Sequence, residues 1–347
     1  MTTMKALVHT APYRLEISDF PVPTLAPTDV LVRVKAVGIC GSDVQGYTGT
    51  TGRRLPPIIL GHEAAGIVED AGADAPALPR GMRVAFDSTI FCNACEACDR
   101  GQYNYCPSRE VLGVSIPGMK RHGAMAEFVR LPWWTLVPMP DHLSFTDAAL
   151  LEPIAISLHA AARGAIAPGE TVCIIGAGTI GLFLLQAALL RGAGRIMVFD
   201  VNEHRLRVAR ALGADIAVSP LDTDPSDVVH ATTEGRGADV SFEVVGIAAT
   251  LHQAIAATRI GGRVVLVGNL TRSIDLNIPD IVSRELTLRG TYCNAGEYRK
   301  AIGLVADGKI ETTSIVSATL SLEQGPEAFD RLHGGQEPEL IKIILHP

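Results

Sequence analysis

The stretch Val172-Cys-Ile-Ile-Gly-Ala-Gly-Thr-Ile-Gly181 decides the fold that we expect for this chain. Residues 172–175 form a short, β-branched apolar run, which favours a strand that is buried on both faces. Three glycines follow in G-x-G-x-x-G spacing, and the run rich in leucine and alanine at 182–190 predicts a helix. A strand, a glycine turn and a helix in this order are typical of a nucleotide-binding α/β domain.

The same glycines indicate a dinucleotide site. Gly176 allows a tight turn, Gly178 leaves room for a pyrophosphate, and Gly181 lets the helix and the strand approach closely. The pyrophosphate would lie at the helix N-terminus, where free N–H groups and the helix dipole favour negative charge. The next predicted strand begins at Ile196 and ends in an acid, Asp200, at the distance that is typical of this motif.

Asp200 predicts NAD rather than NADP as the dinucleotide. Its carboxylate can accept hydrogen bonds from both adenosine ribose hydroxyls, and it would repel a 2′-phosphate. No arginine follows Asp200 directly, and we expect the nearest cation, Arg205, to flank the adenine. The alternative is that Asp200 is an ordinary turn residue at the end of a strand.

Length, composition and charge exclude several classes of protein. The 347 residues suggest two domains, and a hydrophobic fraction of 47% allows large cores. The net charge of −7, without any basic block, argues against nucleic acid as a partner. The start of the chain lacks an apolar secretory core, and the longest apolar run is far short of the about 20 residues that span a membrane. We therefore expect a cytoplasmic protein without a membrane partner.

The predicted pattern of secondary structure changes near Pro153. Before it, short β-branched stretches such as 29–37 and 64–69 are broken by prolines and glycines, which predicts an irregular, β-rich domain. After it, strands alternate with helices, which predicts an α/β domain with a doubly wound parallel sheet. The six predicted strands are 172–175, 196–200, 216–219, 240–245, 263–268 and 286–290. We also expect a helix over 295–307 and a strand over 340–345 that returns to the first domain.

Four of the seven cysteines predict a structural zinc site. They are Cys92, Cys95, Cys98 and Cys106, and at this spacing four thiolates can surround one tetrahedral Zn²⁺ and close its coordination shell. The residues between the first three cysteines, Asn93, Ala94, Glu96 and Ala97, are small or polar and have no apolar face to pack, so a metal would order this loop. Without an export signal the pattern favours a metal over disulfides. Free surface thiols or adventitious disulfides are the alternative.

A second set of metal-binding side chains is spread along the chain. The set comprises Cys40 in Gly38-Ile-Cys-Gly-Ser-Asp43, His62 and Glu63 in Gly61-His-Glu-Ala-Ala-Gly66, and Glu152 in Leu151-Glu-Pro153. A thiolate, an imidazole and a carboxylate leave one position of a zinc ion open for water or substrate. Each residue also fits an ordinary role, as a core cysteine, a buried histidine or an acid at a helix start. Spacing alone leaves the two interpretations balanced.

These motifs together resemble those of the zinc-dependent medium-chain alcohol dehydrogenases, in particular the polyol branch with sorbitol and other sugar-alcohol dehydrogenases. The resemblance covers essentially the whole chain. It implies a GroES-like β-rich catalytic domain at 1–153 and 293–347 and a Rossmann NAD-binding domain at 154–292. It also implies a homo-oligomer, either a tetramer or a dimer, that pairs through the late strands of the nucleotide domain.

The resemblance assigns roles to individual residues. Cys40 and His62 become ligands of a catalytic zinc ion. Glu63 and Glu152 share the carboxylate role, directly or through bound water, and the sequence does not decide between them. Ethanol-type members carry a cysteine where Glu152 stands, so Glu152 points to the polyol branch. The residues that would contact the cofactor are Gly176, Gly178, Thr179, Ile180, Gly181, Asp200, Arg205, Val245 and Val267.

A proton relay is also implied. Asp43 would fix the tautomer of His62, and Ser42 would pass the hydroxyl proton of the substrate towards the nicotinamide ribose. The family's relay commonly ends in a histidine two positions after the aspartate, where this chain has Gln45. An amide cannot take up and release a proton near pH 7. We therefore expect the last transfer to go by water or through another residue.

The sequence thus predicts an NAD-dependent dehydrogenase with two zinc ions per subunit that oxidises a secondary alcohol of a polyol, a small-molecule substrate. The alternatives are dehydrogenases of a phosphorylated polyol, of the galactitol-phosphate type, or of L-threonine. A protein that binds NAD and keeps only the structural zinc is the non-enzymatic alternative.

The loop 48–54 next to Tyr47 is a candidate substrate contact. Arg53-Arg54 would meet a phosphate, unless the two arginines are solvated surface residues. The segment 292–294 is a second candidate, with core packing as its alternative.

Overall fold

The computed structural model describes residues 2–347, and the chain divides into two compact units. One unit comprises the residues up to Ala155 together with Asn294–Pro347, and the other comprises Ile156–Cys293. These boundaries differ by one or two residues from the positions 153/154 and 292/293 expected from the sequence. Each unit has its own hydrophobic core, so the two are described in turn.

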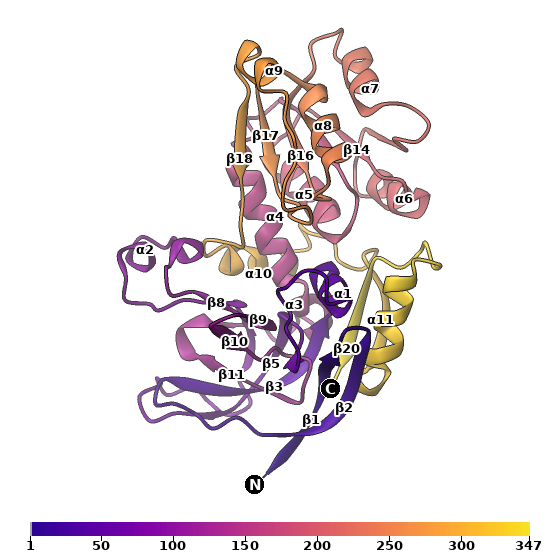
Figure 1. Ribbon diagram of the computed structural model, residues 1–347. Helices are drawn as coiled ribbons and strands as arrows, with labels where there is room; N and C mark the ends of the chain where they lie inside the picture. The colour runs from indigo at the N-terminus through magenta and orange to yellow at the C-terminus, as the bar shows by residue number, and fades with distance from the viewer. Residues whose placement is uncertain (1) are drawn as a thin grey trace. The chain divides into compact units, whose positions relative to one another are not determined.

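The unit Ile156–Cys293 is built around a six-stranded parallel sheet (Figure 1). Its strand order is β15-β14-β13-β16-β17-β18. The strands are β13 (Thr171–Ile175), β14 (Arg195–Phe199), β15 (Ile216–Val218), β16 (Ala238–Glu243), β17 (Thr258–Leu266) and β18 (Thr287–Gly290). All six predicted strands are present, although several begin or end at other residues, and the doubly wound parallel sheet is confirmed. The central strands β13 and β16 are buried along their whole length, as expected for a sheet that is covered on both faces.

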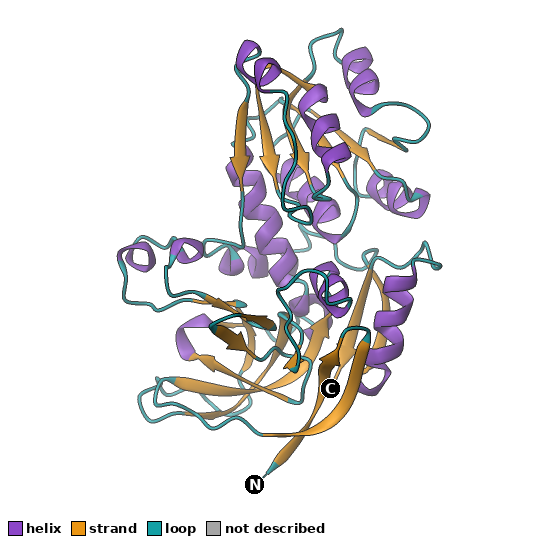
Figure 2. Cartoon of the chain, viewed as in Figure 1, coloured by secondary structure: helices purple, strands orange, loops and turns teal. Residues whose placement is uncertain are grey.

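Helices flank this parallel sheet (Figure 2). They are α5 (Thr179–Leu190), α6 (Glu203–Ala211), α7 (Pro225–Thr232), α8 (Ala248–Ala257) and α9 (Ile278–Ser283), and α4 (Leu151–Gly164) begins in the other unit and ends in this one. Helix α5 is apolar on all sides, which suits a helix that lies inside the domain. The Asn202 side chain caps α6 by accepting a hydrogen bond from the backbone N–H of Arg205.

The other unit is β-rich, as the sequence predicted. Its largest sheet has seven strands, β12 (Leu136–Pro138), β6 (Arg83–Phe86), β5 (Glu63–Ala71), β3 (Asp29–Gly38), β20 (Lys342–His346) and β19 (Val316–Ser321), with β11 (Phe128–Pro132) paired to β3. A three-stranded sheet contains β2 (Arg14–Pro21), β1 (Thr3–Ala11) and β4 (Ile58–Ile59). Two two-stranded sheets pair β7 (Thr89–Ile90) with β8 (Glu110–Val111) and β9 (Val114–Ile116) with β10 (Met119–Arg121). The predicted last strand is β20, which pairs with β3 and so returns the chain to this unit.

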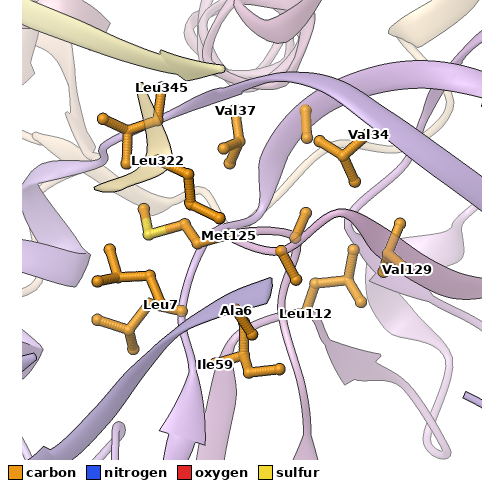
Figure 3. Packing of buried hydrophobic residues seen from close by; sticks show 14 of the residues in the cluster. Ala6, Leu7, Val34, Val37, Ile59, Leu112, Met125, Val129, Leu322 and Leu345 are labelled. Carbon is orange, nitrogen blue, oxygen red and sulfur yellow. The ribbon is translucent and has the colours of Figure 1, made fainter. Parts of the chain in front are cut away.

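The core of the β-rich unit fixes the segments that carry the metal-binding residues. Figure 3 shows Met125 surrounded by apolar side chains from several strands, including Leu7 of β1, Val37 of β3 and Ile59 of β4. Each fully buried side chain of this size contributes about 2 kcal/mol of hydrophobic free energy. Val37 lies three residues before Cys40, so this packing holds the end of β3 in place.

The helices of the β-rich unit are short. They are α1 (Gly41–Tyr47), α2 (Glu96–Asp99), α3 (Phe145–Ala149), α10 (Tyr298–Ala306) and α11 (Gly325–Gly334), and η1 (Tyr103–Tyr105), η2 (Trp133–Thr135) and η3 (Leu322–Gln324) are 3₁₀ turns. Helix α10 occupies most of the helix predicted over 295–307. The Tyr47 hydroxyl donates to Asp330 Oδ1 at 2.7 Å and thereby ties α1 to α11. Tyr47 is therefore a buried core residue and not part of an open polar loop. Within residues 2–347, every helix is too short or too polar to cross a bilayer.

Candidate metal centres and nucleotide site

Three side chains from two neighbouring strands come together in the β-rich unit. Cys40 follows β3 and forms the N-cap of α1, while His62 and Glu63 lie at the start of β5. The antiparallel register of β3 and β5 places Gly38 opposite Glu63, which brings the end of one strand to the beginning of the other. One ligand atom from each of Cys40, His62 and Glu63 lies within 4.8 Å of the other two.

Gly38 makes room for the carboxylate of Glu63. A Cβ at position 38 would lie 2.4 Å from Glu63 Oε2, closer than any side chain could tolerate. On the other side, Lys342 Nζ of β20 donates to Glu63 Oε2 at 2.6 Å and to the carbonyl of Ile39 at 2.9 Å. Both charged groups are almost fully buried. The carboxylate is therefore held next to the cysteine and the histidine by a buried cation.

The imidazole of His62 is oriented by Asp43. His62 Nδ1 lies 3.4 Å from Asp43 Oδ2, so the ring can present Nε2 to a metal ion. Burial lowers the pKa of His62, but the charges of Asp43 and Cys40 outweigh it and raise that pKa well above the usual value. Burial likewise raises the pKa of Asp43, and the neighbouring His62 and Arg54 overcome it and bring it down to about 2. An anionic Asp43 is the acceptor that a metal-binding histidine requires.

Glu152 lies outside the three-residue group. Its Oε1 accepts a hydrogen bond from Ser88 Oγ at 3.3 Å. Burial, which the charge of His62 partly offsets, raises the pKa of Glu152 to about 8, and the negative charges of Glu63 and Asp87 add to the rise. Of the two glutamates, Glu63 is the one whose carboxylate is grouped with Cys40 and His62.

Arg54 interacts with two residues of the predicted relay. Its Nε lies 3.2 Å from Asp43 Oδ1, and its Nη2 donates to Ser42 Oγ at 3.2 Å. Ser42 Oγ in turn donates to Cys40 Sγ at 3.4 Å. The guanidinium of Arg54 is thus engaged inside the protein, which does not suit the phosphate contact that we considered from the sequence.

The four cysteines of the loop form a closed cluster. All four Sγ atoms lie within 4.8 Å of one another, with Cys95 Sγ 3.5 Å from Cys98 Sγ and Cys92 Sγ 3.9 Å from Cys98 Sγ. Thiolates around a tetrahedral zinc ion, at about 2.3 Å from the metal, are about 3.8 Å apart. A disulfide would need a separation of about 2.0 Å, and all four cysteines are free. The donor set therefore fits a zinc ion.

Replacing Cys95 with serine is expected to remove one zinc ion per subunit and to lower the thermal stability. A serine hydroxyl does not replace a thiolate on zinc, and a bound zinc ion contributes to folding stability. Plasma emission spectrometry of the purified variant measures the zinc content, and calorimetry measures the unfolding temperature. An unchanged zinc content would refute the assignment of this cluster.

The glycine motif of the α/β unit has the geometry of a phosphate site. Gly176 has φ +108°, in the region that favours glycine, and a Cβ on Gly181 would lie 1.9 Å from the carbonyl oxygen of Gly176. A Cβ on Gly178 would meet nothing within 4 Å, so the space next to this residue is open. Gly178 is also the N-cap of α5 and supplies no side-chain cap, so the first N–H groups, beginning at Thr179 and Ile180, can bind an anion.

The remaining predicted cofactor residues lie at the carboxyl edge of the same sheet. Asp200 follows β14, and its two oxygens accept hydrogen bonds from the backbone N–H groups of Ala177 (2.7 Å) and Asn202 (2.8 Å). Arg205 Nη1 lies 3.9 Å from Asp200 Oδ2. Val245 follows β16 and Val267 follows β17, and both backbone N–H groups donate to Glu243.

Sequence reasoning did not find Lys342 and Ser88, and it considered Arg54 only as a phosphate contact. A lysine inside the apolar run 340–345 was an available signal, because a charged residue in a buried strand needs a partner. Nothing in the sequence distinguishes Arg54 from Arg53, and Ser88 belongs to no motif. These contacts join residues far apart in the chain, such as Glu63 and Lys342, which are 279 positions apart.

Comparison with known proteins agrees with this geometry. Residues 179–307 match the zinc-binding dehydrogenase family, and residues 26–141 match the alcohol dehydrogenase GroES-like domain. The chain is 36% identical to sorbitol dehydrogenase of Bacillus subtilis, over 99% of this chain and 97% of the relative. It is 35% identical to L-idonate 5-dehydrogenase of Vitis vinifera, over 96% and 92% of the two chains.

A solved structure supports the same conclusion. A zinc-binding dehydrogenase of Sinorhizobium meliloti 1021, bound to NADP, superimposes with a TM-score of 0.89 at 31% identity, and the match covers 100% of both chains. Fold, glycine motif, thiolate cluster and the group at Cys40 thus occur in one chain whose relatives are dehydrogenases. The chain therefore belongs to the zinc-type medium-chain alcohol dehydrogenase family.

Proposed function

We propose that this dehydrogenase oxidises a secondary hydroxyl group of a polyol with NAD⁺ and one catalytic zinc ion. The observation that carries the proposal is the convergence of Cys40, His62 and Glu63 to within 4.8 Å. These are three ligand types that zinc accepts, and they are partly open, since Cys40 is not fully buried. A binding protein with only a structural zinc would have no need of such a group.

Each residue near the metal site would have its own role in the oxidation of the alcohol. When bound, the zinc ion lowers the pKa of the substrate hydroxyl and NAD⁺ accepts the hydride. Cys40 and His62 would hold the metal, and Asp43 would keep the ring of His62 in place. Ser42, which is exposed next to Cys40, would accept the proton of the substrate hydroxyl and at the same time release its own proton towards the nicotinamide ribose. Gln45 cannot complete the relay by titration, so water would carry the proton away.

Glu63 and Glu152 would have different roles in this scheme. Glu63 is the carboxylate close enough to bind the metal, although the ammonium group of Lys342 compensates part of its negative charge. Glu152 would act through a bound water molecule, because its carboxylate is turned to Ser88. The carboxylate at position 152, where ethanol-type members have cysteine, and the similarity to sorbitol dehydrogenase both support a polyol substrate.

Asp200 supports NAD as the cofactor. A carboxylate has about four lone-pair positions, and two of those of Asp200 are used by Ala177 and Asn202, which leaves acceptors for two ribose hydroxyls. The negative charge disfavours a 2′-phosphate. One solved relative contains NADP, so membership of the family does not decide between NAD and NADP. The choice has to be measured for this chain.

Replacing Asp200 with serine is expected to lower the preference for NAD⁺ over NADP⁺ by about 10- to 100-fold. Hydrogen bonds to a charged group contribute about 1.5–3 kcal/mol each, and removing the charge also removes the repulsion of the 2′-phosphate. Steady-state kinetics with both cofactors give the ratio of kcat/KM values. An unchanged ratio of kcat/KM values would mean that Asp200 does not distinguish NAD⁺ from NADP⁺.

A screen of NAD⁺ reduction tests the proposed reaction. The substrates are polyols such as sorbitol, sugar alcohol phosphates, L-threonine and a simple primary alcohol, each with the zinc-loaded protein. We expect the highest kcat/KM with an unphosphorylated polyol. A higher value with threonine or a phosphate would replace the proposed substrate class, and no activity with any alcohol would leave only a cofactor-binding protein.

We propose that two copies of the chain pair along β18 to form a dimer, which could assemble further to a tetramer. Strand β18 is at the edge of its sheet, and Ile260, Ile278 and Val282, all more than half exposed, lie in the segments that precede it. Exposed apolar side chains beside an open sheet edge favour association. Light scattering of the purified protein measures the mass.

The cluster of free thiols favours a reducing compartment, for which we propose the cytoplasm.

A further inference from the structure

We propose that Arg54 is a positioning residue of the zinc site, and that Gly46 is glycine in order to admit it. The guanidinium would hold Ser42 and Asp43 in one arrangement, and through Asp43 it would hold His62. The part of this proposal that concerns catalysis rests on the proposed dehydrogenase function, whereas the part that concerns zinc affinity does not.

Arg54 is buried and bound to groups that face the metal-binding residues. Its side chain is 6% exposed and that of Asp43 is fully buried, with Nε and Oδ1 3.2 Å apart. The other oxygen of Asp43 lies 3.4 Å from His62 Nδ1. One carboxylate therefore lies between a permanent cation and the imidazole, with Oδ1 facing Arg54 and Oδ2 facing His62.

Ser42 is the second group that Arg54 fixes. Arg54 Nη2 donates to Ser42 Oγ at 3.2 Å, and the hydroxyl donates to Cys40 Sγ at 3.4 Å. A hydroxyl group has one proton and two acceptor positions. Arg54 fills one acceptor position, so the orientation of the hydroxyl is set and one acceptor position stays available for a substrate proton. Without Arg54 only the contact with Cys40 Sγ would orient the hydroxyl.

Gly46 provides the space that Arg54 needs. A Cβ at position 46 would lie 2.1 Å from Arg54 Cγ and 2.8 Å from Arg54 Cβ, so any other residue would displace this side chain. The backbone of Gly46 does not have a positive φ, and the residue lies within α1. Conformation alone would therefore favour alanine at this helical position. Close packing against Arg54 explains the glycine.

The geometry also explains why Arg54 and not Arg53 has this role. Arg54 pairs with Ser115 in an isolated bridge of the backbone, which fixes the start of its side chain. Its Nη1 donates to the carbonyl of Arg53, so a third hydrogen bond anchors the guanidinium. The planar group reaches Asp43 and Ser42 at the same time, as lysine could not.

The test uses three variants: Arg54→Ala, Gly46→Ala and the double variant. In Arg54→Ala we expect kcat to fall about 10- to 100-fold with little change in KM, because partners behind metal ligands have effects of this size. We expect a comparable loss in Gly46→Ala, since the added Cβ displaces Arg54. In the double variant the loss should be no greater than in Arg54→Ala alone, because alanine at 54 leaves room for the new methyl group.

Zinc release provides a readout that is independent of activity. A chelator that reports zinc by its colour follows the release of both ions from each protein. Arg54→Ala should weaken the binding of one zinc ion about tenfold or more and leave the zinc of the four-cysteine cluster unchanged. Matched controls are Gly303→Ala, a helical glycine whose Cβ would meet nothing within 4 Å, and Arg33→Ala, which removes an arginine paired with Glu69.

The outcomes separate this proposal from the proposed function. Wild-type zinc release and wild-type kcat in Arg54→Ala would overturn it, and so would a loss of both zinc ions together with unfolding. Additive losses in the double variant would show that Gly46 does not serve Arg54. If the wild-type protein reduces no cofactor, the dehydrogenase function fails, and the selective zinc release still decides the role of Arg54.

Discussion

Replacing Cys40 with alanine is expected to remove one of two zinc ions and to lower kcat/KM about 1,000-fold or more. Cys40 supplies the only thiolate near His62 and Glu63 among the residues grouped there, so an imidazole and a carboxylate paired with Lys342 would have to hold the metal alone. A catalytic zinc contributes several kcal/mol to the transition state, and each 1.4 kcal/mol is a factor of about ten in rate. Zinc analysis and steady-state kinetics measure the two effects.

Cys173→Ala is the matched control for this variant. Cys173 is a buried cysteine of β13 in the other unit, and it belongs to neither metal-binding group. We expect two zinc ions and nearly unchanged kinetics, with a small loss of stability from the lost sulfur atom. An active Cys40→Ala protein that keeps both zinc ions would contradict the catalytic role of Cys40.

Replacing Lys342 with methionine is expected to lower the free energy of unfolding of the zinc-free protein by about 3–5 kcal/mol. Its ammonium group and the carboxylate of Glu63 are 2% and 1% exposed, and the substitution leaves the carboxylate buried without a counter-charge. The loss should be smaller in the zinc-loaded protein, because the metal then compensates the charge. Urea unfolding with and without a chelator measures both values.

The double variant Glu63→Gln, Lys342→Met is the control for that prediction. It removes both charges, so most of the lost stability should return, since the cost arises from one unpaired charge and not from the missing contact. If Lys342→Met unfolds at the same urea concentration as the wild type, the buried ion pair does not have the importance assigned to it here.

The parallel sheet could be predicted from the sequence because most of its strands are short, mainly apolar runs between helices. The largest difference is in β17, which begins at Thr258 and not near Arg263. The pair Gly261-Gly262 read as a break, whereas the strand continues through it with a register shift against β16. A Cβ on Gly262 would lie 2.4 Å from Thr258 Cγ2, so this glycine permits a close approach inside the strand.

The site could be predicted only in its parts. Motif spacing identified the cysteines of the cluster and suggested Cys40, His62 and Glu63, since zinc accepts few kinds of ligand. The partners of these residues could not be predicted, because Lys342 and Arg54 reach them through tertiary packing and belong to no pattern. The closeness of Glu63 to Cys40 likewise depends on the pairing of β3 with β5.

The central claim is that Cys40 and His62 hold an exchangeable zinc ion. X-ray diffraction from crystals of the zinc-loaded protein, measured on both sides of the zinc absorption edge, tests it most directly. We expect two anomalous peaks per chain, one inside the four-cysteine cluster and one about 2.0–2.3 Å from Cys40 Sγ and His62 Nε2. A single peak at the cluster, with nothing between Cys40 and His62, would contradict it.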